Sequence, residues 1–293
     1  MNKVYEIVTE QILSLLDKGV IPWKQSWNCK TELPQNLVSG KAYQGINVWL
    51  LLSSYYASPY WLTFNQVQKL GGSIRKGEKS SIVVYWNLKE VKEVNETSGK
   101  PEVKKIPFLK YYRVFNLNQC EGIAHPESIS ADPIYPIQEA ERIIDGYADS
   151  PEIKHGFTRA SYNSGTDIVK MPDKSAFSSV EEYYATLFHE LTHSTGHKSR
   201  LDRDTLMKHA SFGSKEYSRE ELIAEMGAAF LCGLTGIAQA TIENSAAYIQ
   251  SWRQIINNDP KLVVLAAAQA QKAVNHICGQ KIAEGIENDE TQG

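Results

Sequence analysis

The chain has 293 residues, a net charge of -3 and 42% hydrophobic residues, enough length and apolar content for two ordinary domains. No early apolar run is long enough for a signal peptide or a membrane span, so we expect a cytoplasmic protein without membrane contact. The cysteines lie far apart and form no C-x-x-C pair, which speaks against a cysteine zinc site and gives no reason to predict disulfides. They are Cys29, Cys120, Cys232 and Cys278.

Charge is distributed unevenly along the chain. Residues 1–125 hold 16 Lys and Arg against 10 Asp and Glu, together with five of the six tryptophans, whereas the remainder holds 15 against 24. A basic, aromatic-rich part joined to an acidic part predicts two domains with different partners. We expect domains over 1–125 and 137–283, a proline-containing linker over 126–136, and a disordered polar tail over 284–293.

The first part predicts a small α+β domain, because a segment with apolar residues at helical spacing is followed by runs rich in β-branched and aromatic residues. The expected elements are a helix from Val4 to Leu16, a short helix capped by Thr63 and Gln66, strands at 81–86 and 108–115, and a charged, mobile hairpin excursion over 89–105.

Aromatic residues interleaved with Lys and Arg in this first part suit single-stranded nucleic acid. Bases can stack on exposed rings while the cations neutralise phosphates. The competing interpretation is that most of these rings belong to the core of a small domain whose net charge is modest. The candidate residues are Trp23, Trp27, Lys41, Tyr43, Arg75, Lys76 and Lys79.

The second part predicts a mainly helical domain with a small strand pair. Two short strands flank the turn at 164–166, and Ser178 and Ser179 each precede a glutamate by three residues, which is the pattern of a capping box opening a helix. The remaining expected helices cover about 137–148, 218–231, 242–257 and 260–278.

The helix opened by that capping box carries the H-E-x-x-H sequence from His189 to His193, and Gly196 is a natural stop for it. Positions four apart lie on one helix face, so His189 and His193 can offer two imidazole nitrogens to one metal ion. Glu190 stands beside the first ligand, where a carboxylate can take a proton from a metal-bound water. The competing interpretation is a helix with two surface histidines.

A catalytic zinc site needs a third protein ligand. His197 is close in sequence, but Gly196 is expected to end the helix before it. Metzincins continue as H-E-x-x-H-x-x-G-x-x-H, and here Ser199 occupies the place of the last histidine, so the metzincin pattern fails.

Glu221 and Glu225 are the carboxylate candidates for this ligand, because they lie four apart on a helix with apolar residues on every face. A buried carboxylate needs a partner, and one ligand plus one carboxylate supporting a ligating histidine satisfies both. Structural roles compete: Ser218 and Glu221 form a capping-box pattern, and Glu225 can pair with Arg219 or Arg253.

Over nearly its whole length, the chain resembles the ArdC-type antirestriction proteins of mobile genetic elements. The resemblance rests on several separate motifs that occur in order. These are Pro22-Trp23, Asn36, Gly40 to Asn47, Trp61 to Phe64, Arg75 to Glu78, Val114 to Asn116, Tyr183 to His193, Thr195 to His197, Arg200-Leu201 and Glu220 to Leu231.

This resemblance implies an N-terminal single-stranded-DNA-binding domain and a C-terminal zincin-like metallopeptidase domain that together protect incoming DNA from restriction during conjugation. Related zincins follow H-E-x-x-H with E-x-x-A-D/N, in which the first Glu binds metal and the last position supports a histidine. By this resemblance Glu221 is the third ligand, and Glu225 supports a histidine or is the alternative ligand. The expected cofactor is Zn²⁺ or another divalent metal.

The sequence therefore predicts an antirestriction protein that binds single-stranded DNA and cleaves an unknown protein substrate, such as a restriction-system component. Candidates for stabilising the oxyanion are Tyr162, Tyr217 and His209. One alternative is a non-catalytic DNA-binding protective protein with a structural or idle metal site. Another is a primase-accessory module, because this kind of N-terminal domain is also expected in conjugative primases.

Overall fold

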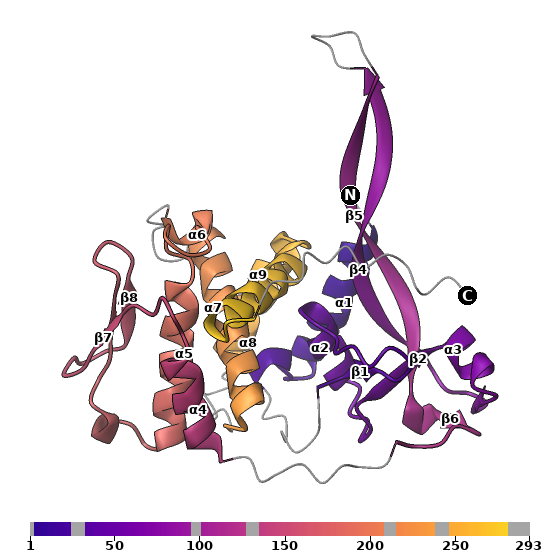
Figure 1. The fold of residues 1–293 in the computed structure, drawn as a ribbon, viewed down its shortest axis with the longest axis horizontal. Helices are drawn as coiled ribbons and strands as arrows, with labels where there is room; N and C mark the ends of the chain where they lie inside the picture. The colour runs from indigo at the N-terminus through magenta and orange to yellow at the C-terminus, as the bar shows by residue number, and fades with distance from the viewer. Residues whose placement is uncertain are drawn as a thin grey trace.

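The computed structural model describes residues 3–24, 33–94, 101–126, 135–207, 215–237 and 246–280, and it confirms the predicted α+β class (Figure 1). Most of the predicted linker and the whole predicted tail lie outside these residues, so the predicted domain boundaries stay predictions. Among the helices that the structure describes, none combines the length and apolar character needed to cross a membrane.

A four-stranded sheet forms the centre of the N-terminal region. The strands of this region are β1 Gln35–Asn36, β2 Tyr60–Thr63, β3 Ser73–Ile74, β4 Ser81–Val94, β5 Pro101–Asn116 and β6 Cys120–Glu121. The sheet has the order β1-β2-β5-β4, and β3 pairs separately with β6. β4 and β5 form a long antiparallel hairpin that projects away from the rest of the molecule (Figure 1).

The helices of this region are short apart from the first. They are α1 Lys3–Asp17, α2 Ile46–Leu52 and α3 Phe64–Lys69, with the 3₁₀ helices η1 Pro22–Lys24 and η2 Leu117–Gln119. The predicted cap of α3 is confirmed: the Thr63 hydroxyl accepts the Gln66 N–H at 3.3 Å, and the Gln66 side chain accepts the Thr63 N–H at 2.8 Å.

The hairpin predicted over residues 89–105 is present as the outer part of β4 and β5, but these strands extend well beyond the predicted 81–86 and 108–115. β4 and β5 stay paired from Ser81 opposite Val114 to Val94 opposite Pro101. The predicted strands stopped short of this charged stretch, but antiparallel pairing rests on backbone hydrogen bonds and does not require an apolar face. Residues 95–100 lie outside the described residues.

The C-terminal region is mainly helical. Its elements are α4 Pro136–Asp145, β7 Glu152–Lys154, β8 Ser161–Asn163, β9 Ile168–Lys170, the 3₁₀ helix η3 Lys174–Ala176, α5 Val180–Ser194, α6 Asp204–Met207, α7 Lys215–Thr235, α8 Ala246–Asn258 and α9 Leu262–Ile277. The predicted strand pair is present as β8 and β9, and β7, which was not predicted, completes the sheet by pairing parallel with β9.

The two regions share one hydrophobic core. A single cluster of buried residues extends from α1 and α2 to α7, α8 and α9, and Figure 1 shows the indigo helices lying against the orange and yellow ones. Trp49 of α2 stacks on Phe230 of α7 with ring centroids 4.6 Å apart. The basic and acidic parts of the chain are therefore joined by apolar packing as well as by the covalent chain.

Candidate metal centre

Helix α5 presents the two histidines. Ser179 caps its first turn by accepting the Glu182 N–H, as the sequence predicts, and the helix ends at Ser194. His189 and His193 lie one turn apart on the face toward α7, and their Nε2 atoms are 3.1 Å apart. The predicted pairing of the two imidazoles on one helix face is therefore present.

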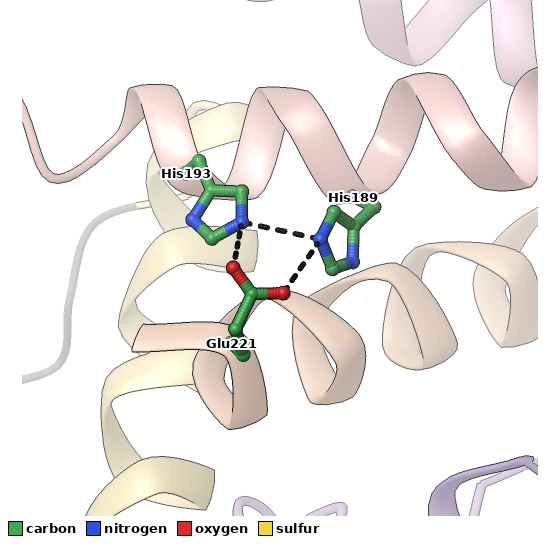
Figure 2. Close-up of side chains that lie close together, drawn as sticks. All are labelled: His189, His193 and Glu221. Atoms are coloured by element: carbon green, nitrogen blue, oxygen red, sulfur yellow. Dashed lines mark hydrogen bonds and ion pairs between the residues drawn. The ribbon is translucent and has the colours of Figure 1, made fainter. Parts of the chain in front are cut away.

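Helix α7 completes the group with Glu221. One carboxylate oxygen lies 3.6 Å from His189 Nε2 and the other lies 3.6 Å from His193 Nε2 (Figure 2). The three potential ligand atoms all lie within 4.8 Å of one another. Two imidazole nitrogens and a carboxylate are the donor set of a catalytic divalent-metal site that keeps one position open. The residues present therefore fit the expected metal.

Close packing of the two helices brings this carboxylate to the histidines. Where α7 crosses α5, a Cβ atom at Gly227 would lie 2.4 Å from Thr192 Cγ2. Such a distance is far inside van der Waals contact, so a side chain at this position would push the helices apart. The lack of a side chain at Gly227 is thus part of what sets the distance between Glu221 and the histidines.

Glu220 contacts the His193 ring at Nδ1, the nitrogen that does not face Glu221. Its Oε1 lies 3.3 Å from His193 Nδ1, so the Nδ1–H can donate to the carboxylate while Nε2 faces Glu221. Burial alone would raise the pKa of Glu220, but His193 and Arg203 outweigh burial and lower that pKa to about 2. Glu220 is therefore held ionised in the position that fixes the His193 ring.

Arg203 fixes Glu220 in turn. Its guanidinium donates to both Glu220 oxygens, at 2.5 and 3.2 Å, and the Thr205 hydroxyl donates to one of them at 2.6 Å. The same guanidinium donates to the Thr195 hydroxyl at 2.6 Å, which ties this network to the end of α5. With side-chain exposures of 4% and 6%, Arg203 and Glu220 form a buried, hydrogen-bonded ion pair.

Sequence reasoning missed both Glu220 and Arg203. Because neighbouring residues on a helix point about 100° apart, Glu220 and Glu221 can approach His193 from different sides. The adjacent pair Glu220-Glu221 was the one sequence feature that could have predicted this role of Glu220. Arg203 lies in the loop after α5, where no periodicity marks it. The competing interpretation of Glu221, a capping box with Ser218, does not apply, because Ser218 lies inside α7, which spans Lys215–Thr235.

Glu190, the expected general base, lies in the same site. It is 8% exposed, and its charge acts on both His193 and Tyr217. Tyr217 lies one turn before Glu221 on α7 and hydrogen-bonds to it. Burial raises the pKa of the Tyr217 phenol, and the nearby charge of Glu221 raises it further. Tyr217 is thus the oxyanion candidate that the structure places beside Glu221.

Of the other two oxyanion candidates, the structure describes only Tyr162, and its hydroxyl contacts a different carboxylate. The Tyr162 hydroxyl donates to Asp167 at 2.7 Å, and Asp167 in turn pairs with the buried guanidinium of Arg200. His209 lies outside the described residues. His197, already set aside as a ligand by its sequence position, has its Nδ1 2.7 Å from the Ser199 hydroxyl.

Glu225 lies one turn beyond Glu221 but contacts a different part of the molecule. Its carboxylate accepts the Trp23 indole N–H at 2.9 Å and the Tyr248 hydroxyl, and the Lys24 ammonium lies 3.6 Å from the centre of the Tyr248 ring. The prediction that Glu225 supports a histidine was therefore wrong, and Glu220 makes that contact. Glu225 connects α7 and α8 with η1 of the N-terminal region.

The structure separates the nucleic-acid candidates into two groups. Trp23 is fully buried and Tyr43 is 5% exposed, so neither ring face is open to a base, because both belong to the packed interior. The four cationic candidates Lys41, Arg75, Lys76 and Lys79 are exposed, and Arg75 pairs with Glu78 at 3.0 Å. Trp27 lies outside the described residues.

Two protein families match successive parts of the chain. The family described as the N-terminal domain of anti-restriction factor ArdC matches residues 2–115, and the family described as a zincin-like metallopeptidase matches residues 138–269. The antirestriction protein ArdC of plasmid R388 is similar over the whole fold. Its metal-free crystal structure has a TM-score of 0.72 and 38% identity, covering 93% of this chain and 96% of that one.

A second crystal structure of the same R388 protein, with Mn(II) bound, has a TM-score of 0.71 and 36% identity, covering 96% of this chain and 99% of that one. The DNA primase TraC of Escherichia coli is 35% identical over 92% of this chain, which spans only 26% of that protein. Protein y4eC of Sinorhizobium fredii is 32% identical, with 95% of this chain and 92% of that protein covered.

Proposed function

Because this chain belongs to the ArdC family of antirestriction proteins and carries a zincin-like metallopeptidase domain, we propose that it is an active metal-dependent peptidase that also binds single-stranded DNA. The observation that carries the peptidase half is the convergence of His189, His193 and Glu221 beside Glu190. The function is protection of incoming DNA against restriction during conjugation.

His189, His193 and Glu221 would hold the metal, for which zinc is our proposal. When bound, the ion supplies Lewis acidity, which polarises a peptide carbonyl and lowers the pKa of water. The Glu190 carboxylate is placed to accept the proton of the attacking water and to return it to the leaving amine. The Tyr217 hydroxyl, next to Glu221, can donate a hydrogen bond to the oxyanion.

A divalent metal other than zinc remains compatible with the donor set. Imidazole and carboxylate oxygen suit several first-row metals, and the R388 relative was crystallised with Mn(II). Dialysis of the metal-free protein against equal Zn²⁺ and Mn²⁺, followed by elemental analysis, tests the assignment. Selective uptake of manganese would overturn zinc and leave the site assignment intact.

Two observations support the proposed binding of single-stranded DNA. Residues 2–115 match the N-terminal domain family of ArdC, and this region has exposed cations at Lys41, Arg75, Lys76 and Lys79. Cations that neutralise phosphates release counterions, so the affinity for an oligonucleotide should fall steeply with added salt. The TraC primases match 92% and 93% of this chain, which spans only 26% and 20% of their own length, so their priming activity is not assigned to it.

A protein substrate, such as a component of a restriction system, is proposed from the antirestriction role. The test compares the wild type with Glu190→Gln, using fluorescein-labelled casein as a general substrate, with and without single-stranded DNA. We expect metal content to be unchanged and cleavage to fall about 100-fold or more. Equal cleavage by the two proteins would reject the peptidase and favour a non-catalytic protective protein with a structural or idle metal site.

A further inference from the structure

One face of the β4–β5 hairpin carries a row of aromatic side chains near its base. In the antiparallel register, Val83 lies opposite Tyr112 and Tyr85 lies opposite Lys110. Directly opposed residues share a sheet face, as do residues two apart on one strand. Tyr85, Phe108, Lys110 and Tyr112 therefore point to the same side, and we call these four residues the aromatic face.

Two rings of this face contact each other, and all three stay partly open to solvent. The Tyr85 and Tyr112 rings meet edge to face with centroids 5.8 Å apart, and Tyr43 lies beneath Tyr85 at 6.5 Å. The Lys110 ammonium lies 4.9 Å from the centre of the Tyr112 ring, and Phe108 is 38% exposed. The face thus combines aromatic surface with a cation.

The opposite face of the same hairpin is different in kind. Ile82, Val84 and Leu109 alternate with the aromatic residues and are buried in the core shared by both regions. On the aromatic side, Val83 and Val114 belong to a small separate cluster with Tyr43, Leu51 and Trp61, and Tyr85 and Tyr112 pack half-buried against it. The packing of the protein therefore buries the apolar residues of one side of the hairpin in the main core, whereas the rings of the other side lie over a smaller cluster.

A basic turn reaches the other end of this cluster. Tyr56 packs against the cluster and meets Trp61 edge to face at 5.7 Å. The turn of residues 75–79 leads directly into β4, whose first residue Ser81 lies opposite Val114 of this cluster, and the Gln119 side chain donates to Glu78 of the turn at 2.9 Å. Cations thus lie at one end of the aromatic face, at Arg75, Lys76 and Lys79, and within it at Lys110, between Tyr112 and Phe108.

We propose that the aromatic face is the base-stacking surface for single-stranded DNA, with Lys110 and the turn 75–79 contacting the phosphates. Aromatic side chains interleaved with cations along a sheet offer stacking to bases of any sequence and neutralise the backbone. Unpaired bases expose their flat faces, whereas a duplex buries them in its own stack. The inference rests on the proposed binding of single-stranded DNA by this region and names the residues that perform it.

The test measures the affinity of the full chain for a fluorescent oligothymidylate of about 16 nucleotides and for an abasic strand of equal length. Phe108→Ala and Tyr112→Ala should each weaken oligothymidylate binding about tenfold, whereas Tyr112→Phe, which keeps the ring, should bind nearly as the wild type does. The advantage of oligothymidylate over the abasic strand should shrink in the two alanine variants.

Tyr111→Ala is the matched control, because Tyr111 is also 38% exposed but lies on the other face of β5. Its affinity should equal that of the wild type. If Phe108→Ala and Tyr112→Ala keep wild-type affinity and preference for bases, the proposed surface is rejected while DNA binding stands. If the wild type itself binds no oligonucleotide at low salt, the proposed DNA binding fails. Phe108→Ala carries the test if Tyr112→Ala does not fold.

Discussion

The metal centre and the aromatic face show two ways in which this chain supports a functional surface. The metal centre places three side chains from two helices within 4.8 Å, and a buried ion pair between Glu220 and Arg203 fixes one of them. The aromatic face has edge contacts between rings and a small cluster beneath. Coordination demands precise ligand positions, whereas stacking tolerates variation, so only the first needs a layer of supporting charges.

Removing a metal-ligating side chain should have the largest effect of the changes that test this contrast. His189→Ala should lower the affinity for Zn²⁺ more than about 100-fold, because it removes a donor atom outright, whereas loss of a supporting contact costs about 10- to 100-fold. Elemental analysis after dialysis measures the loss. His197→Ala is the control, since His197 contacts Ser199, and it should retain the metal. Full metal content in His189→Ala would contradict the assigned site.

Breaking the supporting pair comes next. Glu220→Ala leaves the Arg203 guanidinium buried without its carboxylate, so the free energy of unfolding should fall by about 3–5 kcal/mol. Urea unfolding in the presence of a chelator measures this without a contribution from bound metal. Adding Arg203→Met to the same chain should recover part of the loss, because the stranded charge is gone. Wild-type stability in Glu220→Ala would show that the pair is not needed.

Glu225→Gln separates the third glutamate of α7 from the metal centre. It weakens the hydrogen bonds that the carboxylate accepts from Trp23 and Tyr248, so the free energy of unfolding should fall by about 1.5–3 kcal/mol. Zn²⁺ affinity should be unchanged, because Glu221 and Glu220 occupy the positions around His193. A large loss of metal with normal stability would instead assign Glu225 to the site.

The smallest expected effect concerns single phosphate contacts near the aromatic face. Lys76→Ala should weaken single-stranded DNA binding by a few-fold and lower the slope of log affinity against log salt by about one unit or less. Fluorescence anisotropy at several salt concentrations measures both. Lys198→Ala, an exposed lysine next to the H-E-x-x-H helix, is the control and should leave the slope unchanged.

Local signals in the sequence were sufficient for most helices and for two of the metal-binding candidates. The Ser179 and Thr63 caps, the helical spacing before Gly19 and the four-residue spacing of His189 and His193 depend on neighbours within one turn. The same local view gave strand bounds that were too short: it predicted strands at 81–86 and 108–115 with a hairpin excursion between them, whereas pairing extends to Val94 opposite Pro101.

Sequence alone determined that a capped helix presents two histidines and a glutamate, and that glutamates on a later helix are the carboxylate candidates. Tertiary structure decided among those glutamates: Glu221 faces both histidines, Glu220 supports one of them, and Glu225 contacts Trp23. It also decided which aromatic rings are buried and which stay partly open. Periodicity fixes the spacing of side chains on one element, but the rotation of that element against the rest of the core determines what each side chain meets.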